Sequence, residues 1–248
     1  MTEPLPYSAD QFFDQRAETE IFARVYLPYF LSAYQHGIDN VLLGRARRKG
    51  FSEFVRERLR RKSLEHAALA VATTKKKLQE VLMETLDEGG GVQELARGIR
   101  NVFAISSKVR SLRIARTELT DVINDGSNET LRSEGYPQKE WSTVIDGAER
   151  PTHHNANGQT VGVNEFFRVG SEAARYPGDA TLTPGERISC RCLIVGAGLS
   201  EDRKRQVGRR FLRVHGALER RFVVSLRRAF DAQRDRILTQ FPAPDANS

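Results

Sequence analysis

Apolar residues recur at helical spacing through almost all of the first 135 residues, and this periodicity constrains the fold more than any other feature of the chain. Ser8 and Gln11 have the form of a capping box at the start of the first periodic stretch. A helix is therefore predicted from about residue 9 to the basic stretch before Gly50, with a bend at Pro28, which lacks a backbone donor. Its apolar positions, 3 to 4 residues apart, include Phe22, Val25, Tyr26, Tyr29 and Phe30.

Three further helical stretches are predicted before residue 135. The first begins after Ser52, a helix N-cap residue type, and ends at the glycines 89–91. A short helix follows at residues 92–102, and a long one begins after Ser106 or Ser107. Gly135 and Pro137 end that long helix.

The pattern changes after Pro137 to short strands and turns. Strands are predicted at residues 141–145 and near 161–163, separated by a polar turn at 146–160. Residues 170–187 show no period and are expected to form a long loop. Residues 188–195 alternate with a period of two, which predicts a strand carrying Cys190 and Cys192 on one face.

These elements predict an α+β fold with long N-terminal helices, a small antiparallel or mixed sheet in residues 138–196, and a long C-terminal helix. The predicted division is a helical region at 1–105, a core at 106–198, an amphipathic helix at 199–241 and a tail at 242–248.

The net charge of +7 comes from the predicted C-terminal helix. Residues 201–241 hold twelve Lys and Arg against five acids, and the rest of the chain holds 27 of each. Contact with duplex DNA, insensitive to sequence, or with an acidic protein is therefore assigned to this helix. Alternatively, the arginines form the solvated face of a helix that packs on its apolar side. The candidate contact residues are Arg209, Arg210, Arg213, Arg220, Arg221, Arg227 and Arg228.

Composition excludes other classes of protein. No apolar run approaches the roughly 20 residues that cross a bilayer, and the N-terminus lacks a signal-peptide pattern. We therefore expect no membrane contact and synthesis in the cytoplasm. With only Cys190 and Cys192, two positions apart, a disulfide framework is not expected.

Two cysteines and two adjacent histidines could bind zinc. His153, Cys190 and Cys192, with one further group, are the candidate ligands. The Cys-x-Cys spacing is shorter than in most zinc motifs, which favours buried structural thiols and solvent-facing histidines instead. No other cofactor is indicated.

Charged residues in the same region have two further interpretations. Arg116, Glu118, Asp146, Arg150 and Arg191 could form an Arg–carboxylate network that holds the long helix against the sheet. Alternatively, Cys190, His153 and Asp146 could act as nucleophile, base and orienting carboxylate of a hydrolase. A strand position for Cys190 would not lower its pKa, which disfavours the hydrolase.

Several short motifs occur in a fixed order: ARTE at 115–118 with Arg116, Thr117 and Glu118, then Trp141, then Asp146 with Arg150 and His153, and finally ERISCRC at 186–192. NGQTV at 157–161, Glu165 to Phe167 and YPGD at 176–179 lie between them. This order, over about residues 60–196, resembles the Mu F-like phage head morphogenesis proteins, also called minor head proteins. Ser189 stands where that family usually has Asn, so a turn or cap role could be retained but a role that needs an amide could not.

The resemblance implies a minor head protein of the phage virion that acts in head morphogenesis near the portal. The expected partners are portal, scaffold or major capsid protein, with packaged DNA as a further contact, and the expected location is the head interior. The resemblance implies interaction surfaces in place of catalysis. The alternatives are a toxin-like or hydrolytic enzyme on the same domain, and a part of a larger head or portal polypeptide.

Overall fold

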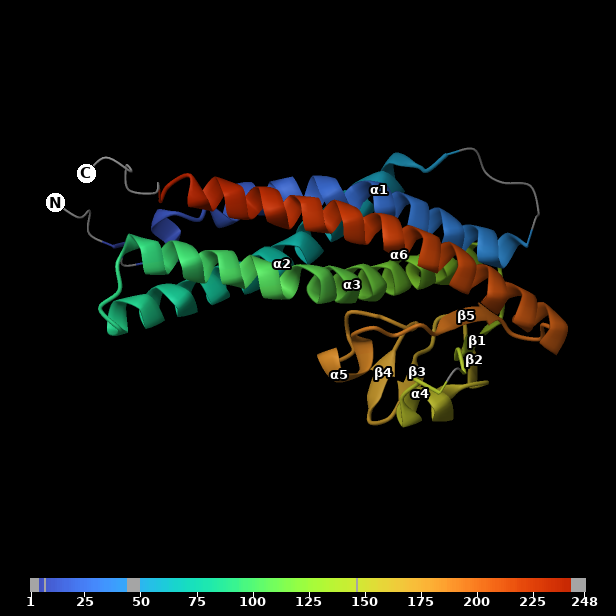
Figure 1. The fold of residues 1–248 in the computed structure, drawn as a ribbon. Helices are drawn as coiled ribbons and strands as arrows, with labels where there is room; N and C mark the ends of the chain where they lie inside the picture. The colour runs from blue at the N-terminus through green and yellow to red at the C-terminus, as the bar shows by residue number, and fades with distance from the viewer. Residues whose placement is uncertain (1–4, 7, 44–49, 146, 242–248) are drawn as a thin grey trace. The chain divides into compact units, whose positions relative to one another are not determined.

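The computed structural model describes residues 5–6, 8–43, 50–145 and 147–241, apart from the side chains of 105–108. Long helices and short strands confirm the predicted α+β class (Figure 1). The long helices are α1 (Gln15–Leu42), α2 (Glu53–Asp87), α3 (Val92–Ser133) and α6 (Glu201–Leu238). The shorter elements are η1 (Ala9–Gln11), β1 (Gln138–Ser142), α4 (Pro151–Ala156), β2 (Thr160–Gly162), β3 (Phe167–Val169), β4 (Glu172–Ala174), α5 (Pro184–Arg187) and β5 (Leu193–Gly196).

The first helix begins later than the sequence predicts. Ser8 and Gln11 do form the capping box, but it caps the three-residue η1. The helix α1 begins at Gln15, where Asp14 Oδ1 accepts a hydrogen bond from the backbone N–H of Ala17. Pro28 lies inside α1, as predicted.

The helix α3 is continuous from Val92 to Ser133, so the predicted break before Ser106 or Ser107 is wrong. Neither glycine nor proline occurs between residues 99 and 125, and a serine alone does not end a helix. The predicted second helix is confirmed by α2, in which Ser52 Oγ accepts from the N–H of Val55.

Two small antiparallel sheets lie between α3 and α6 in the sequence. One has the strand order β2-β1-β5, with Glu140 paired to Thr160 and to Val195, and the other pairs β3 with β4. Gly170, at φ +59°, allows the tight turn from β3 to β4. The two segments predicted as turn and loop also contain regular elements that the prediction missed. The 146–160 segment contains α4, and the 170–187 segment contains β4 and α5. β1 begins three residues before the predicted Trp141.

The chain forms two compact units, each built from separate segments. Unit 1 consists of residues 1–27, 57–111 and 223–248. In it, Phe22 on α1 packs on Phe230 of α6 with ring centroids 4.8 Å apart. Glu18 accepts a bidentate ion pair from Arg236, at 2.8 and 2.7 Å, so helical segments distant in sequence are joined.

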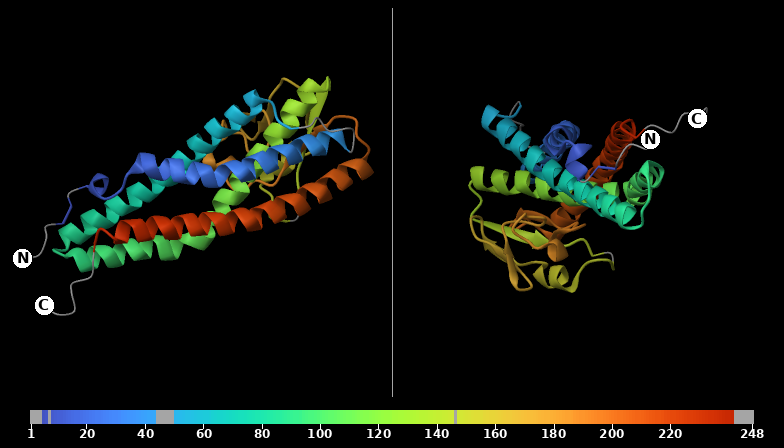
Figure 2. Two further views of the ribbon diagram at one scale, coloured as in Figure 1. Left: turned by 90° about the horizontal axis from the view of Figure 1, so that it is seen from above. Right: turned by 90° about the vertical axis from the view of Figure 1, so that its left-hand side faces the viewer.

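Unit 2 consists of residues 28–56 and 112–222 and contains both sheets. Its core surrounds Trp141 and Phe167, whose rings meet edge to face at 5.4 Å. The segments of α1 and α3 in this unit approach closely, because a Cβ on Gly126 would lie 2.5 Å from the carbonyl oxygen of Tyr34. Figure 2 shows the same elements from two further directions. None of the helices in the described part of the chain is both long enough and apolar enough to cross a membrane.

Candidate functional site

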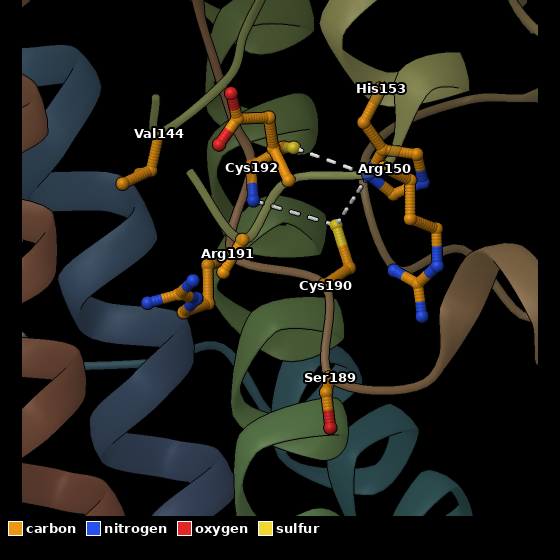
Figure 3. A pocket seen from close by; sticks show the side chains of 9 residues that line it. Val144, Arg150, His153, Ser189, Cys190, Arg191 and Cys192 are labelled. Atoms are coloured by element: carbon orange, nitrogen blue, oxygen red, sulfur yellow. Dashed lines mark hydrogen bonds between the residues drawn. The ribbon is translucent and has the colours of Figure 1, made fainter. Parts of the chain in front are cut away.

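Three side chains of unit 2 converge at one buried point (Figure 3). His153 comes from α4, and Cys190 and Cys192 come from the segment between α5 and β5. The Nδ1 atom of His153 lies 3.6 Å from the sulfur of Cys190 and 3.4 Å from the sulfur of Cys192. All three side chains are at most 3% exposed. The structure therefore gathers the three predicted zinc ligands within contact distance.

The segment that carries the cysteines is not a strand, so that prediction is wrong for residues 188–192. Only Leu193–Gly196 pair with β1 as a strand. Ser189 has a left-handed backbone with φ +59°, which interrupts the extended conformation that the alternating pattern suggests. Asn tolerates this conformation well, which is a physical reason for the Asn that the resemblance implies at this position.

Polar side chains on α3 hold this segment through a series of hydrogen bonds. Thr117 Oγ1 accepts from the N–H of Ser189 at 2.9 Å, and Thr120 Oγ1 donates to the carbonyl of Cys190 at 2.6 Å. Asn124 Nδ2 donates to the carbonyl of Cys192, and Asn124 Oδ1 accepts from the N–H of Ile194, both at 3.0 Å. Residues 117, 120 and 124 share one face of the helix, so α3 sets the path of the cysteine segment.

The imidazole of His153 is held on several sides. The Trp141 ring meets it edge to face at 5.7 Å, and Thr143 Oγ1 donates to the His153 carbonyl at 2.7 Å. The second ring nitrogen, Nε2, lies 3.1 Å from a carboxylate oxygen of Glu186, although off the line of a hydrogen bond. Glu186 is itself fixed by the hydroxyl of Thr152. The Nδ1 atom is therefore directed to the two sulfurs.

The pKa values of the two neighbouring thiols are shifted in opposite directions. The hydrogen bond to Cys192, together with burial, raises the pKa of Cys190 well above its ordinary value. The hydrogen bond from Cys190, with a further contribution from His153, holds the pKa of Cys192 well below its ordinary value.

A cavity of about 20 Å³ adjoins the three side chains. It is lined by Val144, Ala148, Glu149, Arg150, His153, Ser189, Cys190, Arg191 and Cys192. This volume holds about one water molecule, which requires roughly 10–15 Å³. A substrate of larger size has no room beside the thiols in this arrangement.

The predicted Arg–carboxylate network has other partners than expected. Arg116 forms a bidentate ion pair with Glu219 of α6, at 2.9 and 3.3 Å. Glu118 accepts from Arg187 at 2.9 Å; burial acts to lower the pKa of Arg187, but Glu118 and Asp121 outweigh it and raise that pKa. Arg116 and Glu118 thus bind different segments, because residues two positions apart on a helix point in different directions.

The remaining predicted site residues have separate roles. Arg150 donates to the backbone carbonyl of Ile188, and Arg191 lines the cavity. His154 is 57% exposed and lies 3.6 Å from Glu149, so the two adjacent histidines do not act together. Asp146 lies outside the described residues, and the tail at 242–248 does too.

Sequence interpretation missed Glu186, Thr143, Thr120 and Asn124, which position the site. One signal was available for two of them. Thr117, Thr120 and Asn124 repeat at intervals of 3 and 4 along α3, so polar residues follow the helical period that otherwise marks an apolar face. Glu186 and Thr143 give no such signal, because their contacts depend on the paths of loops.

Six of the seven predicted contact arginines on α6 are exposed. The exposed six are Arg209, Arg213, Arg220, Arg221, Arg227 and Arg228. Within the described residues, the structure shows no acidic partner for any of these six side chains. Arg210 differs, because it is partly buried and pairs with Asp39 of α1 at 3.5 Å. In unit 2, Arg209, Arg213 and Arg220 follow each other by 4 and 7 positions and form the arginine face of α6. The predicted apolar side is buried at Val207, Phe211 and Phe222.

Comparisons with known proteins identify two relatives that match part of the chain. The chain is 24% identical over 162 residues to the uncharacterized protein YqbB of Bacillus subtilis, covering 59% of this chain and 51% of YqbB. It is 32% identical over 114 residues to the NAD(+)–arginine ADP-ribosyltransferase EFV of Enterococcus faecalis, covering 44% of this chain and 23% of EFV. The chain thus spans about half of one relative and a quarter of the other. No solved structure matches it significantly.

The family model described as phage Mu protein F like protein matches residues 76–195. This match includes all of α3, both sheets except Gly196 at the end of β5, and the His153, Cys190 and Cys192 cluster. It confirms the family that the order of motifs indicates. The chain therefore contains a phage Mu protein F-like region, which covers residues 76–195.

Proposed function

We propose that this protein is a minor head protein of a tailed phage that acts in head morphogenesis near the portal. The observation that carries the proposal is the Mu F-like match over residues 76–195 together with the ordered motifs within it. The proposed location is the interior of the virion head. Portal, scaffold or major capsid protein would be its protein partner there.

The geometry of the site supports an assembly role over catalytic turnover. The three converging side chains are buried, and the adjoining cavity has the volume of about one water molecule. Ligand sites for small molecules are usually several hundred Å³ in volume. A buried, tightly hydrogen-bonded centre of this kind serves to fix the fold that presents outer surfaces to partners.

The arginine face of α6 supports contact with packaged DNA. Arg209, Arg213 and Arg220 are exposed on one side of the helix, and no acid among the described residues pairs with them. Their span of 11 residues corresponds to about 16 Å along a helix, at about 1.5 Å per residue. Guanidinium groups at such intervals can each bind a backbone phosphate, which favours binding insensitive to base sequence.

A triple substitution tests the DNA contact. Arg209, Arg213 and Arg220 are changed together to Gln, and affinity for random-sequence duplex DNA is measured across a range of salt concentrations. Loss of three phosphate contacts should reduce the slope of log K against log salt by about 2.7, at about 0.9 per contact. The matched control changes Arg60, Arg61 and Arg100 to Gln, which removes the same charge from exposed positions elsewhere.

Equal slopes for the triple variant and its control would contradict the DNA contact. Loss of head incorporation in the triple variant, with the DNA slope unchanged, would instead assign the arginine face to an acidic protein partner. The head role itself is tested by locating the protein in intact heads. Density near the portal is the expected result, and absence of the protein from purified heads would refute the proposal.

The second candidate function is a hydrolytic or toxin-like enzyme. The observation that favours it is the approach of Cys190 Sγ to His153 Nδ1 at 3.6 Å, with Glu186 beyond the imidazole. Glu186 would take the orienting role that sequence interpretation gave to Asp146. A Cys190→Ala variant that still assembles into heads, but loses a measured hydrolytic activity of the wild-type protein, would establish the enzyme.

A further inference from the structure

Two thiols and one imidazole nitrogen meet at a single point, and this convergence calls for an explanation beyond packing. A nucleophile and its base require one thiol and one imidazole, whereas here both sulfurs lie within 3.6 Å of the same Nδ1 atom. These three donor atoms lie within 4.8 Å of one another. Thiolate sulfur and neutral imidazole nitrogen are the donors that zinc prefers in proteins.

We propose that Cys190, Cys192 and His153 bind a zinc ion, with His153 coordinating through Nδ1. Zinc bonds of about 2.3 Å to sulfur and about 2.0–2.1 Å to nitrogen, in a tetrahedron, place sulfur and nitrogen about 3.6 Å apart. The two sulfur–nitrogen distances of 3.6 and 3.4 Å match this separation. The donors therefore already lie at the spacing of zinc ligands.

Glu186 completes the arrangement from outside the ligand set. With Nδ1 bound to a metal, Nε2 would carry the proton, and the Glu186 carboxylate oxygen lies 3.1 Å from that nitrogen, although off the line of a hydrogen bond. A carboxylate behind the histidine is the usual partner of a metal-bound imidazole, because it fixes the tautomer and raises the basicity of the ligand. Glu186 is thus a positioning residue for His153.

The protein backbone is also arranged to hold both cysteines. The carbonyl of Cys190 is bound by Thr120 and the carbonyl of Cys192 by Asn124, so α3 fixes the residues that carry the two sulfurs. The adjoining cavity accommodates about one water molecule. A water in that cavity is the fourth ligand that we propose. The zinc would then join α4 to the segment before β5, so that its binding would contribute to the stability of the fold.

The departure from common zinc motifs does not argue against this site. Most zinc motifs separate two cysteine ligands by two to four residues, whereas Cys190 and Cys192 are separated by one. Here Ser189, with φ +59°, turns the chain immediately before the pair, and the segment reaches β5 only at Leu193. Both sulfurs can therefore approach one imidazole from a loop.

Metal content of the full-length protein tests the proposal directly. The protein is produced with added zinc, purified with a non-thiol reductant and without chelators, and analysed by mass spectrometry of its metals. One zinc per chain is expected. After zinc removal, addition of Co²⁺ should give a thiolate-to-cobalt charge-transfer band and the visible bands of a tetrahedral ion.

Adjacent histidines provide the matched comparison. His153→Ala should lose zinc and the cobalt spectrum, whereas His154→Ala, which changes an exposed neighbour, should retain both. Cys190→Ser and Cys192→Ser should each lose the charge-transfer intensity of one sulfur. Glu186→Gln should bind zinc about 10–100-fold more weakly, as for other outer partners of metal ligands. Glu134→Gln, on an exposed side chain, is its control.

Three outcomes would overturn the proposal. The first is wild-type protein that contains no zinc and gives no cobalt spectrum under these conditions, a result that does not depend on the folding of any variant. The second is equal metal binding by the His153 and His154 variants. The third is a metal-free wild type whose hydrolytic activity depends on Cys190, which would assign the thiols to catalysis.

Discussion

Replacing Asn124 by Ala should destabilise unit 2 more than its small change in volume implies. The Asn124 side chain is fully buried and satisfies groups of three segments. Its amide donates to the carbonyls of Pro177 and Cys192 and also to Thr120 of its own helix, and its oxygen accepts from the N–H of Ile194. These four hydrogen bonds measure 2.9–3.1 Å and tie the YPGD loop and the cysteine segment to one side chain of α3.

The magnitude follows from the groups that lose a partner. Three backbone groups outside the helix, the carbonyls of Pro177 and Cys192 and the N–H of Ile194, would be left unpaired in Asn124→Ala. An unsatisfied buried group costs about 1–3 kcal/mol. Allowing for water entering the space, we expect a loss of about 3–5 kcal/mol, a large part of the about 5–15 kcal/mol that stabilises a typical domain.

Urea denaturation, followed by far-UV circular dichroism and by Trp141 fluorescence, measures this loss. Trp141 is the single tryptophan and lies in unit 2, so its emission reports on that unit. Asn101→Ala, at an exposed position on the same helix, is the control and should change stability by less than about 0.5 kcal/mol. A loss in Asn124→Ala no larger than that of the control would refute the role assigned to the amide.

Three further predictions concern glycine packing, the left-handed turn and a buried histidine. Gly126→Ala should lower the free energy of unfolding by about 2–3 kcal/mol in urea denaturation, because its Cβ would lie 2.5 Å from the Tyr34 carbonyl oxygen. Gly208→Ala on α6, with no atom within 4 Å of the new Cβ, should instead raise it by about 0.5–1 kcal/mol. Ser189→Asn should raise the melting temperature and Ser189→Val should lower it, since φ +59° costs a β-branched residue at least about 1–2 kcal/mol; equal melting temperatures would contradict this. Burial lowers the pKa of His215 from 6.5 to about 4, so on acidification the unfolded chain binds a proton before the folded one does, and stability falls as the pH decreases. His215→Gln should therefore lose about 2 kcal/mol less than wild type between about pH 7 and pH 5 in urea denaturation, and parallel pH profiles would refute it.

The helices were largely predictable from the sequence, and the errors have local causes. Glycine and proline ended helices as expected, whereas Ser106 and Ser107 did not begin one, since serine caps a helix only where the preceding chain leaves it. The short strands and α4 were harder, because elements of 3 to 6 residues show little periodicity. β1 began at Gln138 and not at Trp141, with the polar Lys139 buried in the strand.

The candidate site was predictable in its members but not in its geometry. The composition of the chain pointed to His153, Cys190 and Cys192, the only group with two thiols. Their convergence depends on the left-handed turn at Ser189, and a pattern of alternating residues cannot reveal such a turn. Glu186 is brought behind His153 by α5, a four-residue helix without a sequence period of its own.

The burial of both cysteines has a practical consequence for studying the protein in its assembly. Cys190 and Cys192 are 2% and 3% exposed, and they are the two cysteines of the sequence. A maleimide reagent applied to the folded protein should therefore react slowly with the native chain. A single cysteine introduced at an exposed position, such as Phe54 at 76% exposure, would accept a fluorophore or a crosslinker selectively. Distances to neighbouring proteins could then be measured without altering either native thiol.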